Sequence, residues 1–402
     1  MPLLLIWNAT HAQKGLNSIY SAYGIGDYKI RDPNAYLGMG NVGVAMPSVF
    51  SVNETNPSSF AWMPKNNLGL EITFGGVSAK YINEKTNISA GDFTIARIAL
   101  ALQVVNPLRT VVGLRRFSQV EFYTTSVREL SGTTEKMPTD IEGSGGLYQF
   151  YIGNAMKIGK NLAIGINTGF VFGPVNTRET IALNTQESLI SESNKYFNHG
   201  SLSAGFQYAL KSKMNTWIVG AFYEPQISMN VLEETQLKNQ SDVVLSEKKA
   251  VHDQFLYPQK YGAGLTFSRE SFTASVDVIG HLWSATGYKG SHFTATDAYS
   301  FAAGIRHQFK RNSIWGESIG TALYAGYNRE NSYLIIDGHQ LISNAFTIGA
   351  TFPSANNMNF YSVGAKVGSR GVGVYPLVKE NFFEFNFNLN FGGFFYKNKK
   401  YD

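Results

Sequence analysis

The residues whose types could support catalysis or metal binding are few and widely spaced. Seven histidines stand at positions 11, 199, 252, 281, 292, 307 and 339, with no H-E-x-x-H motif and no pair four residues apart to seat a metal. Ser275, Asp277 and His281 share one face of an expected strand, but the rise of a strand puts Ser275 about 20 Å from His281. No G-x-S-x-G turn occurs either. We therefore expect no enzymatic activity, no bound metal and no cofactor.

One glycine motif has the spacing of a dinucleotide-binding fingerprint. Gly38, Gly40 and Gly43 satisfy G-x-G-x-x-G, which in that role needs a preceding buried strand, a following helix and an acidic residue about twenty positions later. Neither element is evident, and the next acidic residues, Glu54 and Glu71, fall at the wrong distances. We interpret the glycines as structural, because glycine allows positive φ and close backbone approach.

The composition excludes several classes of protein. Aromatic residues make up 14% of the 402 residues and charged residues only 16%, against roughly 25% charged in an average soluble protein. No run of about 18 to 20 apolar residues is present, so the chain is not a helical membrane protein. Cysteine is absent, which removes disulfides, Cys-ligated zinc and a lipid anchor on Cys. The net charge of +5 is spread along the chain, so we expect no nucleic-acid binding.

The elements that position these residues have the period of two that is typical of strands. In the last segment Phe383, Phe385 and Phe387 share one parity, while Asn386 and Asn388 share the other, so one face is apolar and the opposite face polar. The same pattern recurs in about fourteen segments. We predict strands over 68–81, 92–105, 110–127, 146–159, 162–183, 199–212, 216–237, 259–269, 272–286, 298–309, 320–338, 342–354, 360–378 and 381–396.

The connections between these strands alternate in length. Short turns such as 106–108 and 213–215 follow even-numbered strands, and long polar loops, including 128–145, 184–198 and 238–258, follow odd-numbered ones. This sorting is the signature of an antiparallel transmembrane barrel with periplasmic turns and extracellular loops. A barrel also closes, because backbone groups in hydrocarbon need partners within the protein. We predict an all-β fold, a transmembrane antiparallel β-barrel of about fourteen strands over residues 68–402. It would lie in the outer membrane of a Gram-negative bacterium, surrounded by outer-membrane lipids. A soluble jelly roll or propeller is the weaker alternative.

The N-terminal part of the chain does not alternate. Residues 1–12 combine an apolar run with small residues at Thr10 and Ala12, and we expect them to be the remnant of a signal peptide. Residues 13–67 are rich in Gly, Asn and Pro. A lumen of fourteen strands is wider than its own side chains can fill, so we expect residues 13–67 to form a periplasmic hatch or plug inside it.

Three motifs in this region carry a resemblance to a known family. Tyr20-Ser21-Ala22-Tyr23-Gly24-Ile25-Gly26-Asp27, then Leu37 to Ala45, then Asn53 to Ala61 with its Asn56-Pro57 element, resemble the N-terminal hatch of FadL/TodX-type outer-membrane transport barrels. The branch found in Bacteroidota is the most similar, and the chain's Val378 to Phe383 and its basic tail resemble that branch too. Ser58 stands where the family has Ala. The resemblance implies a fourteen-stranded barrel with a hatch, whose motif here is Gly38, Gly40, Gly43, Asn56 and Pro57.

Arginines in the third predicted strand break the alternation. Val112 and Leu114 share their parity with Arg116, so a regular strand would direct this guanidinium toward lipid, at a cost of about 2 to 4 kcal/mol at the midplane. Arg116 therefore lies at a membrane interface, where Arg snorkels readily, or the strand is kinked. In FadL-like transporters a kink in the third strand opens the wall laterally. The resemblance places a candidate kink at Gly113, Arg115 and Arg116.

Two functions follow as hypotheses. The first is a passive, hatch-gated outer-membrane channel for hydrophobic small molecules, such as a long-chain fatty acid. Its candidate ligand-binding residues are Met46, Phe50, Phe60 and Trp62, which we choose for their apolar character inside the plug; packing of the plug against the wall explains them equally well. The second is an accessory barrel subunit of an outer-membrane protein secretion or assembly complex, with other envelope proteins as partners. A continuous apolar tunnel would favour the first.

Overall fold

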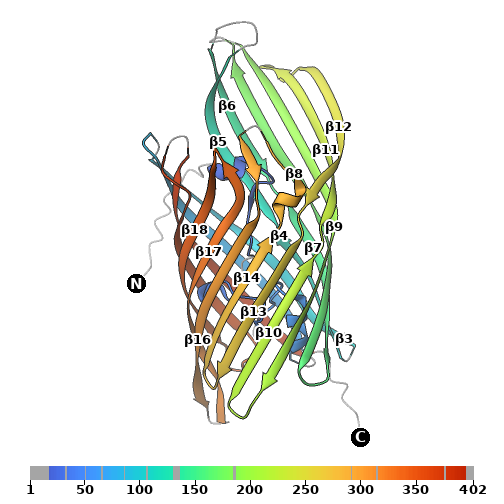
Figure 1. Ribbon diagram of the computed structural model, residues 1–402, viewed down its shortest axis with the longest axis vertical. Helices are drawn as coiled ribbons and strands as arrows, with labels where there is room; N and C mark the ends of the chain where they lie inside the picture. Colours follow the sequence, from blue (N-terminus) through green and yellow to red (C-terminus); the bar gives the residue numbers. More distant parts are fainter. Residues whose placement is uncertain are drawn as a thin grey trace, which may run out of the picture.

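The protein is a tall β-barrel with a short N-terminal segment inside it (Figure 1). The computed structural model describes residues 18–31, 34–49, 51–64, 67–85, 87–105, 107–129, 136–183, 187–290, 292–313, 316–374 and 377–394. The expected signal-peptide remnant and the side chain of Phe50 lie outside these ranges.

Fourteen antiparallel strands form a closed wall, in which each strand pairs with the next and the last pairs with the first. This confirms the predicted fold. In order around the wall the strands are β2 (Asn67–Ile82), β3 (Asn87–Val105), β4 (Leu108–Arg116), β7 (Tyr148–Ile158), β8 (Leu162–Ala182), β9 (Ser188–Lys211), β10 (Asn215–Glu224), β13 (Lys260–Arg269), β14 (Phe272–His281), β16 (Ala298–Ser313), β17 (Gly316–Ile336), β18 (His339–Pro353), β19 (Phe360–Arg370) and β20 (Lys379–Phe394).

Side chains on the wall follow the alternation of the sequence. On β20 the outward Phe383, Phe385 and Phe387 are exposed, while Asn386 and Asn388 face the lumen and are buried. An apolar outer face and a polar inner face are what a barrel surrounded by lipid requires. None of the helices in the described part of the chain is long and apolar enough to cross a membrane.

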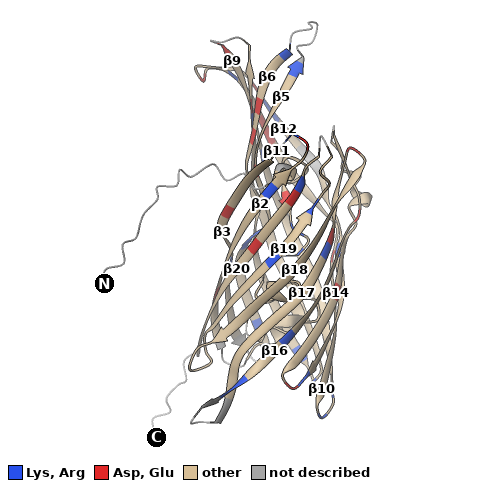
Figure 2. Cartoon of the chain, turned by 90° about the vertical axis from the view of Figure 1, so that its left-hand side faces the viewer, with Lys and Arg blue, Asp and Glu red and all other residues tan. Residues whose placement is uncertain are grey.

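A second sheet rises above the wall on one side (Figures 1 and 2). It joins the outer ends of β8 and β9 to β5 (Ser118–Glu129), β6 (Lys136–Gly145), β11 (Ile227–Asn239) and β12 (Val244–Tyr257) in the order β5-β6-β8-β9-β11-β12. We call this sheet the crest. The prediction of long polar loops over 128–145, 184–198 and 238–258 was wrong, because most of these residues are crest strands.

The crest also explains why two of the predicted strands were too long. The strand predicted over 110–127 ends at Arg116, leaves the ladder at Phe117 and resumes in the crest as β5. The strand predicted over 216–237 is interrupted at Pro225 and Gln226, after which β11 pairs with β9 in the crest, while β10 pairs with β13 in the wall. Proline has no N–H to donate to a ladder, so it favours the break. Strands predicted to reach 286 and 378 end at His281 and Arg370.

The described residues between 18 and 64, here called the luminal segment, lie inside the barrel. Their regular elements are short: η1 (Ile19–Ala22), β1 (Asp27–Tyr28), η2 (Leu37–Met39) and η3 (Pro57–Trp62). The remaining short elements, η4 (Trp283–Thr286) and β15 (Phe293–Ala295), cover the mouth of the barrel beside β12 and β17. Most described side chains of the luminal segment are buried, so the interior of the barrel is a packed core rather than an open pore.

Candidate functional site: the luminal segment and a lateral opening

The glycines of the expected hatch motif lie where backbone meets backbone. A Cβ on Gly38 would come within 2.5 Å of the Gly349 backbone in β18, and Gly40 has φ of 73°, which favours glycine. Gly43 packs on Asn53 and Thr55 within the segment itself. The motif therefore lets the luminal segment lie directly against the inner wall.

Asn56 and Pro57 start the short helix η3. The Asn56 side chain accepts from the backbone N–H of Ser58, and Pro57 occupies the first helical position, where its missing N–H costs nothing. The Asn56 amide also donates to the carbonyl oxygens of Val44, Phe206 and Ala221 at 2.8, 3.1 and 3.2 Å. One side chain thus caps a helix and joins it to two wall strands, β9 and β10.

An ion pair holds the middle of the luminal segment. Arg31 Nη1 lies 2.5 Å from Asp277 Oδ1 on β14, and both side chains are almost completely buried. Asp277 Oδ2 also accepts from the backbone N–H groups of Gly43 and Val44, at 2.8 and 3.0 Å. Because these donors satisfy the carboxylate inside the barrel, Asp277 is a fastening point of the luminal segment.

The partners of Ser275 and His281 differ from those of Asp277. The Ser275 hydroxyl is 2.8 Å from Thr266 Oγ1, and His281 Nδ1 is 3.3 Å from the Tyr28 hydroxyl. These contacts form no nucleophile–base pair of the kind that hydrolysis needs. Among the described residues, no group of three or more His, Asp or Glu side chains is arranged to hold a metal ion.

A second cluster of charges lies deeper in the lumen. Arg97 of β3 contacts Glu71 of β2 and lies 3.3 Å from Glu54 of the luminal segment, with all three side chains buried. Tyr151 of β7 donates to Glu54, and Arg115 lies 3.7 Å from the other oxygen of this carboxylate. Buried charges are tolerated only when paired in this way, so Glu54 binds the luminal segment to three wall strands.

The candidate ligand residues lie in packing contacts. Phe60 is completely buried and rests on Gly153 in a cluster with Ala99, Val111 and Tyr151. Met46 is also buried, in a cluster with the aromatic rings of Tyr36 and Tyr324. Trp62 is partly exposed, and the ammonium groups of Lys157 and Lys211 lie 4.2 and 5.6 Å from its ring. These contacts hold the lower end of the luminal segment against the wall.

The upper end of the segment is fixed by β1 and its charges. Asp27 lies 2.8 Å from Arg370 of β19, which also contacts Glu380, and Lys29 lies 2.8 Å from Glu384 of β20. Burial raises the pKa of the Asp27 carboxyl, but the Arg370 guanidinium outweighs burial, so the pKa lies below its usual value.

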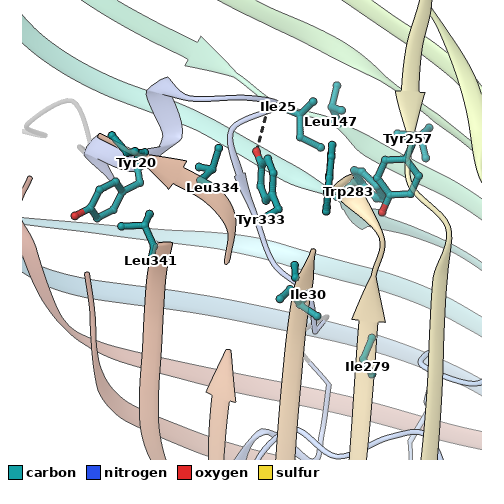
Figure 3. Close-up of a cluster of buried hydrophobic side chains, with 14 of the residues drawn as sticks. Tyr20, Ile25, Ile30, Leu147, Tyr257, Ile279, Trp283, Tyr333, Leu334 and Leu341 are labelled. Carbon is teal, nitrogen blue, oxygen red and sulfur yellow. Dashed lines mark hydrogen bonds between the residues drawn. The ribbon is translucent and has the colours of Figure 1, made fainter. Parts of the chain in front are cut away.

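An aromatic cluster closes the lumen above β1 (Figure 3). The Tyr333 hydroxyl accepts from the Ile25 N–H at 3.3 Å, and the Tyr333 ring stacks on Trp283 with centroids 4.3 Å apart. Tyr257 packs edge-to-face on the same indole at 5.9 Å. Above the cluster, apolar residues of the crest, among them Phe122, Phe197 and Phe255, line a cavity of about 760 Å³ that is partly open to the outside.

The wall has a lateral opening at its outer end. β3 pairs with β4 only from Arg97 inward; over residues 87–96 it pairs with β2 alone within the described part of the chain. The strand that continues β4, β5, pairs with β6 and joins the crest. Figure 2 shows the crest leaning away from β3. We call the gap between residues 87–96 of β3 and β5 the lateral opening.

Irregular backbone on both sides produces the lateral opening. Ala96 is bulged out of the β2–β3 register at the position where pairing with β4 stops. On the other side the chain leaves the ladder at Phe117, opposite Gly145 and Gly146, whose φ angles are 110° and 146°. Gly113 lies inside the regular part of β4, where its lack of a side chain makes room for Tyr151. Arg116 is the last residue of β4 and Arg115 faces the lumen beside Gln149.

Side chains of both signs line the space behind the lateral opening. A cavity of about 150 Å³ is bordered by β3, by residues 116–119, by β1 and by the inner faces of β19 and β20. Ten of its lining residues are acidic or basic: Asp27, Lys29, Arg31, Asp92, Arg116, Glu330, Lys366, Arg370, Glu380 and Glu384. Leu37, Val77, Phe117 and Phe382 add apolar surface, so the cavity offers contacts to polar groups and ions beside apolar ones.

Comparison with known proteins agrees with the fold. A family model described as BamG matches residues 1–402. No curated protein matches the chain. A FadL homologue from Pseudomonas aeruginosa superimposes with a TM-score of 0.62 at 12% identity, covering 92% of this chain and 100% of that one.

Two toluene transporters have similar structures. TodX from P. putida gives a TM-score of 0.60 at 12% identity, and TbuX from Ralstonia pickettii 0.61 at 11%; each comparison covers 92% of this chain and 100% of the other. The chain therefore has the fold of channels for hydrophobic compounds. With its apolar outer band, it is a β-barrel of the Gram-negative outer membrane.

Proposed function

We propose, since the chain belongs to the BamG family, that it is an accessory barrel subunit of a complex that assembles or secretes outer-membrane proteins. In this role its lumen stays closed, and its wall and crest contact the partners. The match to BamG along the whole chain supports this role rather than a free-standing channel.

The fixed luminal segment is the observation that carries the proposal. Its lower and middle parts are held by buried contacts, centred on Glu54 and Asp277, and its upper part by the partly buried pair of Asp27 and Arg370. Moving the segment would leave several charges buried without partners, and breaking one buried pair is strongly destabilising. A gate that opens for each ligand needs two conformations of similar free energy, and these contacts favour one.

The character of the interior supports the same role. The cavity behind the lateral opening is charged, and Met46 and Phe60 are occupied in packing the luminal segment against the wall. An apolar ligand would have to pass ion pairs to enter the lumen from the bilayer. The mouth cavity, where Lys195 and Glu233 stand among the apolar residues, lies above the luminal segment, and residues 20–30 and the aromatic cluster separate it from the lower lumen.

A channel for hydrophobic small molecules is the second candidate function. The observation in its favour is the mouth cavity of about 760 Å³, whose Phe122, Phe197 and Phe255 side chains would receive an apolar molecule from outside. Its ligand would pass the hatch, where Met46, Phe50, Phe60 and Trp62 remain the candidate contacts. This function requires the luminal segment to move.

Purification from the native membrane separates the two functions. The chain is extracted in mild detergent from its own outer membrane, and the proteins and lipids that accompany it are quantified by mass spectrometry. We expect envelope proteins in fixed stoichiometry and no discrete apolar ligand. A barrel that emerges alone with an apolar compound would overturn the accessory role and support the channel.

A further inference from the structure

Two strand edges at the lateral opening have no ladder partner in the described part of the chain. Residues 88–96 of β3 pair with β2 on one side, and nothing described pairs with their other side. Residues 120–129 of β5 pair with β6; on the other side of β5, residues 118 and 119 pair with β1, and the Glu121 backbone groups bond the Ser21 hydroxyl. A free edge presents N–H and C=O groups to whatever lies beside it.

The β3 edge begins within the apolar outer face of the barrel. The Phe93 ring stacks on Phe74 and on Phe385, both at 6.0 Å, and is 62% exposed on the outer surface. Ile95 is exposed on the same face. Hydrocarbon offers no hydrogen bonds to backbone groups, and barrels normally close to avoid such edges. The bulge at Ala96 and the break at Phe117 keep this edge open.

Charges at the lower end of the lateral opening are unequal. The Gln119 amide donates to Asp92 on β3 at 3.0 Å and to Glu121 on β5 at 3.3 Å, so two carboxylates face one another through a neutral group. Arg116 lies 3.5 Å from Asp92. Arg116 and Glu121 also border a hollow of about 780 Å³. One guanidinium, that of Arg116, faces two carboxylates at this point, and the adjacent hollow leaves room for a basic group from another molecule.

We propose that the free edge of β3, residues 88–96, accepts an extended segment of a partner protein as an added β-strand. The segment supplies the missing backbone hydrogen bonds, places apolar side chains beside Phe93 and Ile95, and carries a basic residue at the level of Asp92 and Glu121. This inference rests on the proposed accessory role and names the surface through which the chain would act. Lipid satisfies the apolar contacts but not the backbone groups.

Photo-crosslinking in native membranes tests the inference. Ile95→p-benzoylphenylalanine places the probe beside the free edge. Ile305→p-benzoylphenylalanine is the matched control, because Ile305 is 49% exposed against 50% for Ile95 and belongs to β16, which pairs on both sides. We expect the Ile95 probe to join the barrel to one other protein chain, and the control to yield lipid adducts alone.

Amide hydrogen exchange tests whether the contact is a strand. In the complex extracted from the native membrane, those amides of residues 88–96 that point away from β2 should exchange about tenfold or more slowly than in the isolated barrel, because in the barrel alone they have no strand partner. The amides that point toward β2 are paired in both samples and should change less. Amides of β17, which pairs with β16 and β18, should exchange equally in both samples.

The outcomes distinguish this inference from the proposed function. If partners co-purify but residues 88–96 exchange equally in both samples and the Ile95 probe captures only lipid, strand addition is wrong while the accessory role stands. A crosslinked product of two 44.4 kDa chains would show that the occupant is a second copy of this chain. That result would overturn the inference that a different protein supplies the strand. A barrel that purifies alone and shows no crosslink would overturn both.

Discussion

Arg116, the last residue of β4, lies 3.5 Å from Asp92 of β3 across the lower end of the lateral opening. Below this pair the two strands are joined by backbone hydrogen bonds, and above it they separate. The side chain whose parity conflicted with a regular wall thus marks where the wall ceases to be regular. Because both side chains are about a fifth exposed, water screens their attraction.

Removing this ion pair should therefore have a small effect. We expect Arg116→Gln to lower the free energy of unfolding by about 1 kcal/mol or less, the range for partly exposed pairs. Urea unfolding of the barrel in liposomes measures the change, with Arg128→Gln, at the crest pair with Glu179, as the exposed control. A much larger loss for Arg116→Gln alone would mean that the pair holds the opening together.

Arg31 should behave differently, because it and Asp277 are buried. Arg31→Met leaves the Asp277 carboxylate without its cation, and we expect a loss of about 3 to 5 kcal/mol in the same unfolding assay. Adding Asp277→Asn removes the unpaired charge and keeps an oxygen for the Gly43 and Val44 N–H groups. The double variant should recover most of the loss. If the single and the double variant lose the same free energy of unfolding, the unpaired Asp277 charge is not the cause of the loss.

Gly38 offers a steric test of the contact between the luminal segment and β18. Gly38→Ala brings a methyl group within 2.5 Å of the Gly349 backbone, and we expect a cost of about 1 to 3 kcal/mol. Gly69→Ala is the control, because its new methyl group meets its nearest neighbour at 3.7 Å. Protease cleavage of the luminal segment should increase for Gly38→Ala only. Equal cleavage in both variants would argue against a close backbone contact.

The upper fastening of the luminal segment should weaken in acid. Because the pKa of Asp27 is lowered in the folded chain, its contribution is complete above the ordinary value of 3.8 and is lost as pH falls through the lower folded value. Pepsin cleavage near residue 27 should increase between pH 4 and pH 2, relative to cleavage at the exposed crest turn 240–243. The Asp27→Asn variant should be cleaved readily at both pH values. If cleavage of the unsubstituted chain near residue 27 does not change between pH 4 and pH 2, the assignment of this fastening to Asp27 is wrong.

The wall of the barrel could be predicted from sequence because its signal is local. On β20 alternate residues face lipid and lumen, so the period of two appears directly in the residue types. The crest lacked that signal: Val244 and Leu245 are both exposed, and Lys248 and Lys249 follow, because both faces of β12 meet solvent at this point. The sequence of such a strand therefore predicts a polar loop.

The contacts of the luminal segment could not be predicted in the same way. The sequence put Asp277 on one face of an expected strand with Ser275 and His281, and Arg31 in the segment expected inside the lumen. Their partners depend on how residues far apart in the chain meet, and Arg31 and Asp277 are 246 positions apart. Similarly, an apolar Met46 or Phe60 fits a ligand site and a packed plug equally well until its neighbours are known.

Locking the luminal segment to the wall tests the central claim most directly. The chain has no cysteine, so Leu37→Cys with Gly364→Cys introduces one pair, whose Cβ atoms start 3.0 Å apart and need a small shift to form a disulfide. The oxidised variant replaces the native chain in cells, with each single substitution as a control, and outer-membrane protein levels are measured. We predict wild-type levels for the locked chain. Loss of function in the locked chain, with both single variants active, would show that the luminal segment must move and would contradict a closed accessory barrel.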